Sequence, residues 1–409
     1  METTKSSRIV NTTVLVAALG YFVDIYDLQL FNLVSKASLR GIGITDQALI
    51  DKYDYVLFNW QMTGMLVGGI LWGILGDRRG RKSVLFGSIL LYSLANILNA
   101  FVTSVEQYQW VRFFAGLGLA GELGAAITLV SEIMHKEKRG YGTMIIVAMG
   151  ALGAVVANLV TVSFHWQTSY IIGGGLGLML LMLRFSTFES GMFDQLKKST
   201  VSKGNFLLLF STPERIIKYL ACIFIGLPVW YCIGVLIKFS EGFAKSTNVQ
   251  GAVHIGNAIM FAYLGLSAGD LLSGWLSQVF RNRKKIVLSY LAGSAVLMGI
   301  FLFVNNIPAS VFYCMCFLIG TATGYWALFV TIASEQFGTN IRATVTTTVP
   351  NFVRGAVVPI TLGYKYLELD YGNVNAAVIV GIICIALAIV SVLSIKETFG
   401  KDLDYYEMN

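Results

Sequence analysis

The apolar run GYFVDIYDLQLF holds two carboxylates, Asp24 and Asp27, three residues apart. A charged group costs free energy in an apolar environment, so acids at such places are candidates for binding a proton or a polar ligand. Arg112 and Glu122 lie in a second apolar run, and Arg354 lies in a third. These five side chains suit proton exchange or the binding of a charged solute, provided that the fold brings them together.

The composition indicates a helical membrane protein. The chain has 409 residues, of which 56% are hydrophobic and 13% are charged, whereas soluble proteins carry roughly 25% charged residues. About 20 apolar residues in a helix cross the ~30 Å hydrocarbon layer of a bilayer. The apolar runs that are long enough lie at 11–36, 55–76, 83–103, 107–134, 142–163, 169–189, 217–239, 252–279, 285–304, 309–335, 343–366 and 373–395.

These runs predict an all-α fold of twelve transmembrane helices, arranged as two pseudo-symmetric six-helix bundles around a central cavity. We expect an N-terminal bundle over 1–189 and a C-terminal bundle over 217–396, joined by a cytoplasmic linker over 190–216. A cytoplasmic tail over 397–409 completes the chain.

The charge distribution predicts the orientation of the chain. Most of the 30 Lys and Arg residues lie in the termini and in the even-numbered connections. Such a bias places both termini in the cytoplasm. The net charge of +7 is therefore a signal of topology and not of nucleic-acid binding.

The residues that could support other chemistry are scattered. The five cysteines lie in apolar runs without CxxC spacing, and the three histidines are far apart in sequence, so we expect no metal site and no cofactor. The sequence shows no P-loop and no HExxH or GxSxG motif, which argues against an enzyme. An ion gradient is then the expected source of energy.

Two stretches of the first half recur in the second half. SEIMHKEKRG (131–140) is matched by SEQFGTNIRA (334–343), and GILGDRRGRK (73–82) by GWLSQVFRNRKK (274–285). Both pairs are about 200 residues apart, as expected of a duplicated unit. Repeats of this kind are typical of transporters that work by alternating access, with the binding site between the halves near the bilayer midplane.

GILGDRRGRK closely resembles the loop motif between spans two and three of the major facilitator superfamily. Gly73 and Gly80 allow a close helix contact and a tight turn, and Asp77 can cap a helix or pair with a cation. Arg78 and Arg81 would hold the loop at the lipid headgroups. The resemblance implies a latch that stabilises an outward-open state.

RFFAGLGLAGELGAAITLVSE is similar to span four of the metabolite:proton symporter and sugar porter branches of that superfamily. Arg112 and Glu122 match the pattern, whereas Ala120 replaces a usual glycine. EQFGTNIRATVTTTVPNFVRG resembles the junction between spans ten and eleven. The resemblance and the repeat extend the expected gating set to Glu132, Arg139, Glu335 and Arg342.

Residue counting along the spans predicts two levels of buried charge. Asp27 and Arg112 share an outer level, and Asp24 and Glu122 share a middle level. We expect an ion pair between Asp27 and Arg112, as in the sugar–proton symporters that the chain resembles. A carboxylate binds a proton less readily beside an arginine than in a desolvated site, so a helix movement could switch Asp27 between the two. A static pair that ties the helices is the alternative.

The other charged residues have open alternatives. Asp24 could bind a proton, contact the solute or share a proton with Glu122, which could instead bond to the backbone. Arg354 could pair with Asp270 or hold the carboxylate of a solute. By resemblance, spans seven and ten also line the cavity, and Pro228 and Gly324 could kink or loosen these two helices. The expected solute-binding set therefore adds Trp230, Tyr231, Tyr325, Trp326 and Asn351.

The sequence thus predicts a proton-coupled secondary transporter of a small organic solute, most simply a metabolite with a carboxylate. We expect it to act as a monomer in a lipid bilayer, the bacterial inner membrane, with no nucleic-acid partner. A sugar or zwitterion symporter and a proton-driven exporter are the alternatives, and a non-transporting sensor or scaffold is a more remote one.

Overall fold

The computed structural model describes residues 12–135, 138–184 and 203–407. The predicted linker up to residue 202, the first 11 residues and the last two lie outside the described residues. Within the described part of the chain all regular elements are helices, and one isolated backbone bridge joins Gln250 to Pro308.

The predicted spans are present at close to their predicted positions. The first half contains α1 (Thr12–Gly41), α2 (Gln47–Arg79), α3 (Arg81–Asn99), α4 (Val105–Ile133), α5 (Arg139–Ser163) and α6 (Trp166–Leu183). The second half contains α8 (Pro213–Ile225), α9 (Leu227–Tyr231), η3 (Cys232–Ile237), α11 (Ile255–Val279), α12 (Arg283–Phe303), α13 (Ala309–Thr323), α14 (Trp326–Gln336), α15 (Arg342–Gly355) and α16 (Val357–Ser394). Two short elements, η2 (Phe206–Phe210) and α10 (Ser240–Ser246), lie between spans.

These elements make twelve membrane crossings. Ten helical stretches of the described residues are long and apolar enough to span a bilayer. The last of them covers two crossings, because Gly372 takes a non-helical φ of 75° and ends one helix inside α16. The 33-residue α2 supplies a further crossing, with its charged residues gathered at its two ends.

Spans seven and ten are interrupted, as Pro228 and Gly324 predict. Span seven runs from α8 through α9 into the π-helical turn η3, and Pro228 stands in the first turn of α9. Span ten breaks between α13 and α14 at Gly324. Each break leaves backbone groups whose hydrogen bonds other residues must supply.

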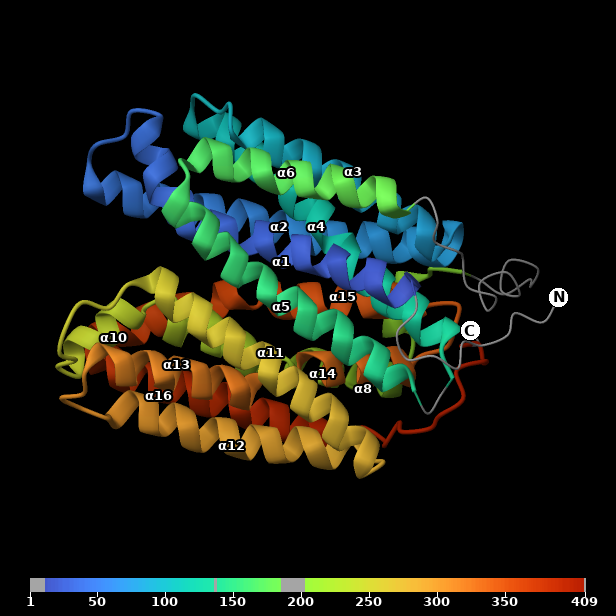
Figure 1. Ribbon diagram of the computed structural model, residues 1–409. Coiled ribbons are helices and arrows are strands. Elements are labelled where there is room, and N and C mark those ends of the chain that lie inside the picture. The colour runs from blue at the N-terminus through green and yellow to red at the C-terminus, as the bar shows by residue number, and fades with distance from the viewer. Residues whose placement is uncertain (1–11, 136–137, 185–202, 408–409) are drawn as a thin grey trace.

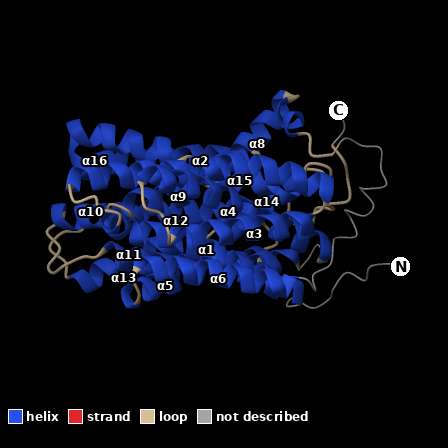
Figure 2. Ribbon diagram, turned by 90° about the horizontal axis from the view of Figure 1, so that it is seen from above, coloured by secondary structure: helices blue, strands red, loops and turns tan. Residues whose placement is uncertain are grey.

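The two halves lie side by side, with α1–α6 above and the later helices below in Figure 1. Viewed from above, the helices run roughly parallel along the length of the molecule (Figure 2). The described chain ends lie together at one end, which we call the termini end, and we call the opposite end the far end. Helix α15 packs on α2 and α4, and α11 packs on α5, so these helices join the halves.

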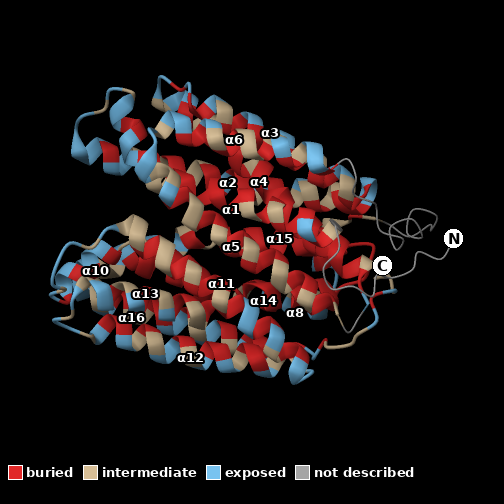
Figure 3. Cartoon of the chain, in the orientation of Figure 1, coloured by how far each residue is buried: buried red, intermediate tan, exposed pale blue. Residues whose placement is uncertain are grey.

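A cavity of about 800 Å³ lies between the halves toward the far end. It opens there, since its lining includes the exposed pair of Lys36 and Asp51. Near its inner limit Gln29 of α1 donates to the Tyr263 hydroxyl of α11 at 2.6 Å. Buried residues dominate the middle and the termini end, whereas exposed residues gather at the far-end loops (Figure 3).

Glycines allow the helices of the first half to pack at very short range. Gly153 of α5 faces the backbone of α1, where an added Cβ would overlap the Phe22 carbonyl oxygen and the Tyr26 nitrogen. Gly175 of α6 has no heavy atom within 4 Å of such a Cβ. Both positions hold glycine, but only Gly175 has room for an added side chain.

We expect Gly153→Ala to destabilise the protein by about 1–3 kcal/mol, because backbone atoms cannot swing aside as a flexible side chain would. Thermal melting in detergent would show a lower midpoint than for wild type. Gly175→Ala is the matched control and should melt at or above the wild-type temperature, since Ala favours a helix over Gly. Equal midpoints for wild type and Gly153→Ala would contradict this account of the α1–α5 contact.

Candidate functional site

One buried ion pair links the two halves beyond the inner limit of the cavity. Arg354 Nη2 of α15 lies 3.3 Å from Asp24 Oδ2 and 3.2 Å from the Tyr21 hydroxyl, both of α1. All three side chains are buried. Asp24 Oδ1 and Arg354 Nε have no hydrogen-bond partner. The pair is thus incompletely satisfied and retains hydrogen-bonding capacity on both sides.

Of the two alternatives for Arg354, the pairing with Asp270 is wrong. Asp270 Oδ1 instead accepts a hydrogen bond from the Ala327 backbone N–H at 2.9 Å, in the first turn of α14. The break at Gly324 exposes these N–H groups, and a carboxylate at a helix N-terminus satisfies them. Asp270 therefore bonds within the second half, and Arg354 pairs with Asp24 instead.

The predicted proton sharing between Asp24 and Glu122 is wrong as well. Both carboxylate oxygens of Glu122 accept hydrogen bonds from the guanidinium of Arg184, at the end of α6. Arg184 also donates to the Leu85 carbonyl oxygen at 2.9 Å. This bidentate pair lies inside the first half, so it fixes α4 against α3 and α6.

Asp27 and Arg112 are both buried in the first half, but they do not form the predicted ion pair. Neither carboxylate oxygen of Asp27 and no guanidinium nitrogen of Arg112 has a hydrogen-bond partner. Arg112 lies over two aromatic rings, with its Cζ 4.6 Å from the Phe31 centroid and 5.9 Å from that of Tyr170. These rings hold the cation, which explains why Arg112 does not reach the acid.

The predicted aromatic residues divide by role within each adjacent pair. Trp230 lines the cavity, and its ring packs against that of Trp326 with the centroids 6.3 Å apart. Tyr231 donates to the Ala377 carbonyl oxygen at 2.6 Å, and Tyr325 donates to that of Ile225 at 2.9 Å. Trp230 thus lines the cavity and Trp326 is buried against its ring, while the tyrosine hydroxyls hold neighbouring helices.

Asn351 does not line the cavity in this structure. Its Nδ2 donates to the Ala120 carbonyl oxygen at 2.8 Å and to that of Thr347 at 2.7 Å. The first bond ties α15 to α4 across the two halves. Asn351 therefore belongs to the contact that closes the molecule beyond the cavity.

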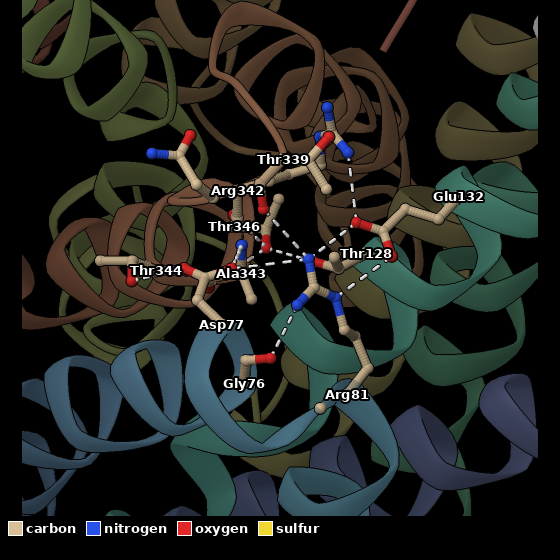
Figure 4. A network of polar contacts seen from close by, with 12 residues as sticks. Gly76, Asp77, Arg81, Thr128, Glu132, Thr339, Arg342, Ala343, Thr344 and Thr346 are labelled. Atoms are coloured by element: carbon tan, nitrogen blue, oxygen red, sulfur yellow. Dashed lines mark hydrogen bonds and ion pairs between the residues drawn. The ribbon is translucent and has the colours of Figure 1, made fainter. Parts of the chain in front are cut away.

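Asp77 closes the termini end by capping a helix of the other half. Its carboxylate accepts bonds from the backbone N–H groups of Ala343 at 3.0 Å and Thr344 at 2.9 Å, and from the Thr344 hydroxyl at 2.7 Å (Figure 4). These groups form the first turn of α15, whose own N-cap residue supplies no side-chain bond. Gly73 admits this approach, because a Cβ there would press on Thr344.

Arg81 and Arg342 share one carboxylate at this end. Arg81 binds both oxygens of Glu132, at 3.1 and 2.8 Å, and Arg342 of the other half reaches Glu132 Oε1 at 3.1 Å (Figure 4). Arg81 also donates to the carbonyl oxygen of Thr339, across the interface, at 3.3 Å. Gly80, with a φ of 102°, makes the turn that starts α3 at Arg81.

The second half repeats this arrangement. Arg283, at the start of α12, binds both oxygens of Glu335 at 2.7 and 2.8 Å, and Arg139 of the first half lies 3.7 Å from Glu335 Oε1. The predicted gating residues thus form two matched networks, each with one arginine from the opposite half. Arg78 does not join them, since its Nε donates to the Lys203 carbonyl oxygen at 3.2 Å near the surface.

The residues that the sequence analysis missed are partners of predicted ones. Arg283 occupies the place of Arg81 in the repeated stretch, so the repeat contained the signal for its role. Tyr21 and Tyr263 lie in apolar runs where tyrosine usually packs, and no motif marks them. Arg184 lies at the end of an apolar run and gave no sign that it would reach Glu122.

The Asp77 cap provides a test of how the termini end is held closed. We expect Asp77→Ala to destabilise this closed contact by about 1 kcal/mol, since it removes a side-chain cap. The reporter is Thr347→Cys, which is buried where α15 meets α4. Maleimide should label this cysteine faster in the Asp77→Ala background.

The control is Asp51→Ala, which breaks an exposed pair at the far end and should leave labelling unchanged. Parallel variants without the reporter measure labelling of the native cysteines. Equal labelling rates with and without Asp77 would show that the cap does not hold the halves together.

Comparisons with known proteins find similar sequences among transporters and a similar fold in a solved structure. NiaP of Bacillus subtilis (strain 168), named for niacin and nicotinamide, is 28% identical over 95% of this chain and 96% of its own length. The 3-(3-hydroxy-phenyl)propionate transporter of Escherichia coli (strain K12) is 28% identical over 88% of this chain and 90% of its own. The structure of the proton:xylose symporter XylE bound to 6-bromo-6-deoxy-D-glucose covers 96% of this chain and 97% of its own, with a TM-score of 0.78 and 16% identity.

The family model of the Major Facilitator Superfamily matches residues 17–361, most of the chain. The resemblance seen in the loop motif is thereby confirmed, and the relatives are transporters and not enzymes. The protein is an integral, multi-pass membrane transporter that belongs to the Major Facilitator Superfamily.

Proposed function

We propose that this transporter of small organic solutes carries organic acids together with protons. The observation that carries the proposal is the buried pair of Asp24 and Arg354, which joins the halves beyond the inner limit of the cavity. A pair between two bodies that move relative to each other must break or change partner during the movement. Arg354 is therefore suited to exchange the Asp24 carboxylate for the carboxylate of a solute.

The arginine favours an acidic solute. A guanidinium matches a carboxylate with two parallel hydrogen bonds, and Arg354 Nε has no partner in this structure. The names of two relatives include two ring-bearing acids, niacin and 3-(3-hydroxy-phenyl)propionate, beside one uncharged amide, nicotinamide. Trp230 lines the cavity, with Trp326 packed against its ring, and an aromatic side chain there suits a solute of that shape.

The coupling arises from competition for one cation. A solute carboxylate that binds Arg354 displaces Asp24, which is then a buried acid without its counter-ion. Such an acid binds a proton more readily, so solute binding recruits a proton to Asp24. With its charge neutralised, the first half can separate from Arg354, and the halves can rock around the site.

The orientation of the chain is part of the proposal. The basic connections place the termini end in the cytoplasm. The cavity at the far end then faces outward, and the Asp77 and Glu132 contacts hold the cytoplasmic end closed. We further propose that the protein acts as a monomer and, since its relatives are bacterial, that it lies in the inner membrane.

Asp27 is the second candidate for the coupling acid. It is buried without a hydrogen-bond partner, and Arg112 lies in the same half of the molecule. The two groups form no ion pair in this structure, so coupling through Asp27 would need a change of contacts within the first half. The Asp24–Arg354 pair needs only the relative movement of the halves, so it is the simpler site of coupling.

We expect Asp24→Asn to abolish proton-driven accumulation and to retain solute exchange, because Asn stays neutral and can still be displaced from Arg354. The assay uses proteoliposomes with labelled nicotinate, and protein-free liposomes give the passive rate. An inward gradient of one pH unit supplies about 1.4 kcal/mol per proton, enough for roughly tenfold accumulation by wild type. Exchange is measured with nicotinate on both sides and no gradient.

Asp27→Asn is the matched variant, one turn away on the same helix, and should still accumulate nicotinate. The reverse pattern, with accumulation lost in Asp27→Asn and kept in Asp24→Asn, would move the coupling to Asp27. If wild type accumulated nicotinate equally with and without the pH gradient, the proposed proton coupling would be wrong.

A further inference from the structure

A lysine in the cavity stands apart from the other cations there. Lys36 pairs with Asp51 at 3.0 Å, and Lys365 pairs with Glu368 at 2.7 Å. Among the described residues, Lys238 has no ion-pair partner, although it lines the same cavity. Its Nζ lies 4.0 Å from the centroid of the Phe58 ring. Lys238 therefore presents an ammonium group in the cavity whose charge no contacting carboxylate neutralises.

The backbone turns this lysine into the cavity. The Lys238 N–H donates to the Ile233 carbonyl oxygen at 3.1 Å, five residues earlier, as the last bond of the π-helical turn η3. One extra residue in a turn rotates the next residues of the helix by about 100°, and π turns occur often at functional sites. The residues of η3 are buried, whereas Lys238, directly after it, is only partly so.

The surroundings of Lys238 suit a ring that carries a negative charge. Phe58 and Trp230 line the same cavity with aromatic faces, and Ile259 adds an aliphatic one. Phe58 belongs to the first half and Lys238 to the second, so a ligand here would contact both. Asp54 also lines the cavity, without an ion pair to Lys238, and is the acid with which a bound anion would compete.

We propose that Lys238 is an anion-binding site in the open cavity, where a monocarboxylate with a single ring docks before it reaches Arg354. The carboxylate binds the ammonium group while the ring lies against Phe58 and Trp230. This inference rests on the proposed function, since it assumes an acidic solute. It adds a separate site that selects acids over neutral molecules of the same shape.

The test compares acids with their uncharged amides in binding to purified protein, measured by calorimetry. The probes are nicotinate, benzoate and 3-phenylpropionate, each paired with its amide. We expect Lys238→Gln to weaken acid binding by roughly tenfold or more and to leave amide binding unchanged. Lys238→Arg keeps the charge and should retain the preference for the acid.

Three further variants separate charge from packing. Lys365→Gln removes a cavity cation that is already paired, so the acid preference should remain. Phe58→Leu removes the ring under Lys238 and should weaken acid and amide alike, with their ratio unchanged. Asp54→Asn removes the competing carboxylate and should tighten acid binding.

The outcomes distinguish this inference from the function on which it rests. If wild type binds an acid and Lys238→Gln binds it equally well, the Lys238 site is wrong and the proposed function stands. If Lys238→Gln weakens acid and amide by the same factor, the lysine only shapes the cavity, and the anion site is likewise wrong. If wild type binds none of the three acids, the proposed solute class falls and the Lys238 site falls with it.

Discussion

Placing a charge inside a membrane costs free energy, and this cost constrains how the two halves of the molecule can move. Asp24 and Arg354 are tolerable there because each neutralises the other, and they belong to different halves of the molecule. Any relative movement of the halves must supply a substitute partner for each. In the proposed mechanism a solute carboxylate replaces Asp24 and a proton replaces Arg354, so that one electrostatic requirement would link transport of the solute to transport of the proton.

Buried charges at the closed end of the molecule must also be neutralised or hydrogen-bonded, and there each carboxylate has several partners. Glu132 and Glu335 each hold two arginines, one from each half, and Asp77 caps α15 from across the interface. Each of these three carboxylates accepts hydrogen bonds that water could also donate. These contacts lie at the end of the bundle, where water can replace them on opening, and so the closed state is held by contacts that can be exchanged.

The fold could be predicted well because one signal, an apolar run long enough to span a bilayer, is repeated along the chain. The apolar runs matched the spans within several residues, and Pro228 and Gly324 marked the two broken helices. The gating residues were also predictable, since their motif occurs twice and the structure pairs the copies. The buried pairs were less predictable. Depth along a helix can be counted, but the direction of a side chain cannot. The alternatives for Arg354 therefore did not include Asp24, and the partner of Glu122, Arg184, was missed.

In the proposed mechanism a solute carboxylate on Arg354 makes Asp24 take up a proton, and this coupling can be measured directly on purified protein in weakly buffered solution near neutral pH. Adding nicotinate should cause proton uptake in amounts equal to the solute bound, and Asp24→Asn should bind nicotinate without that uptake. Binding of nicotinate by wild type with no proton uptake would contradict the account.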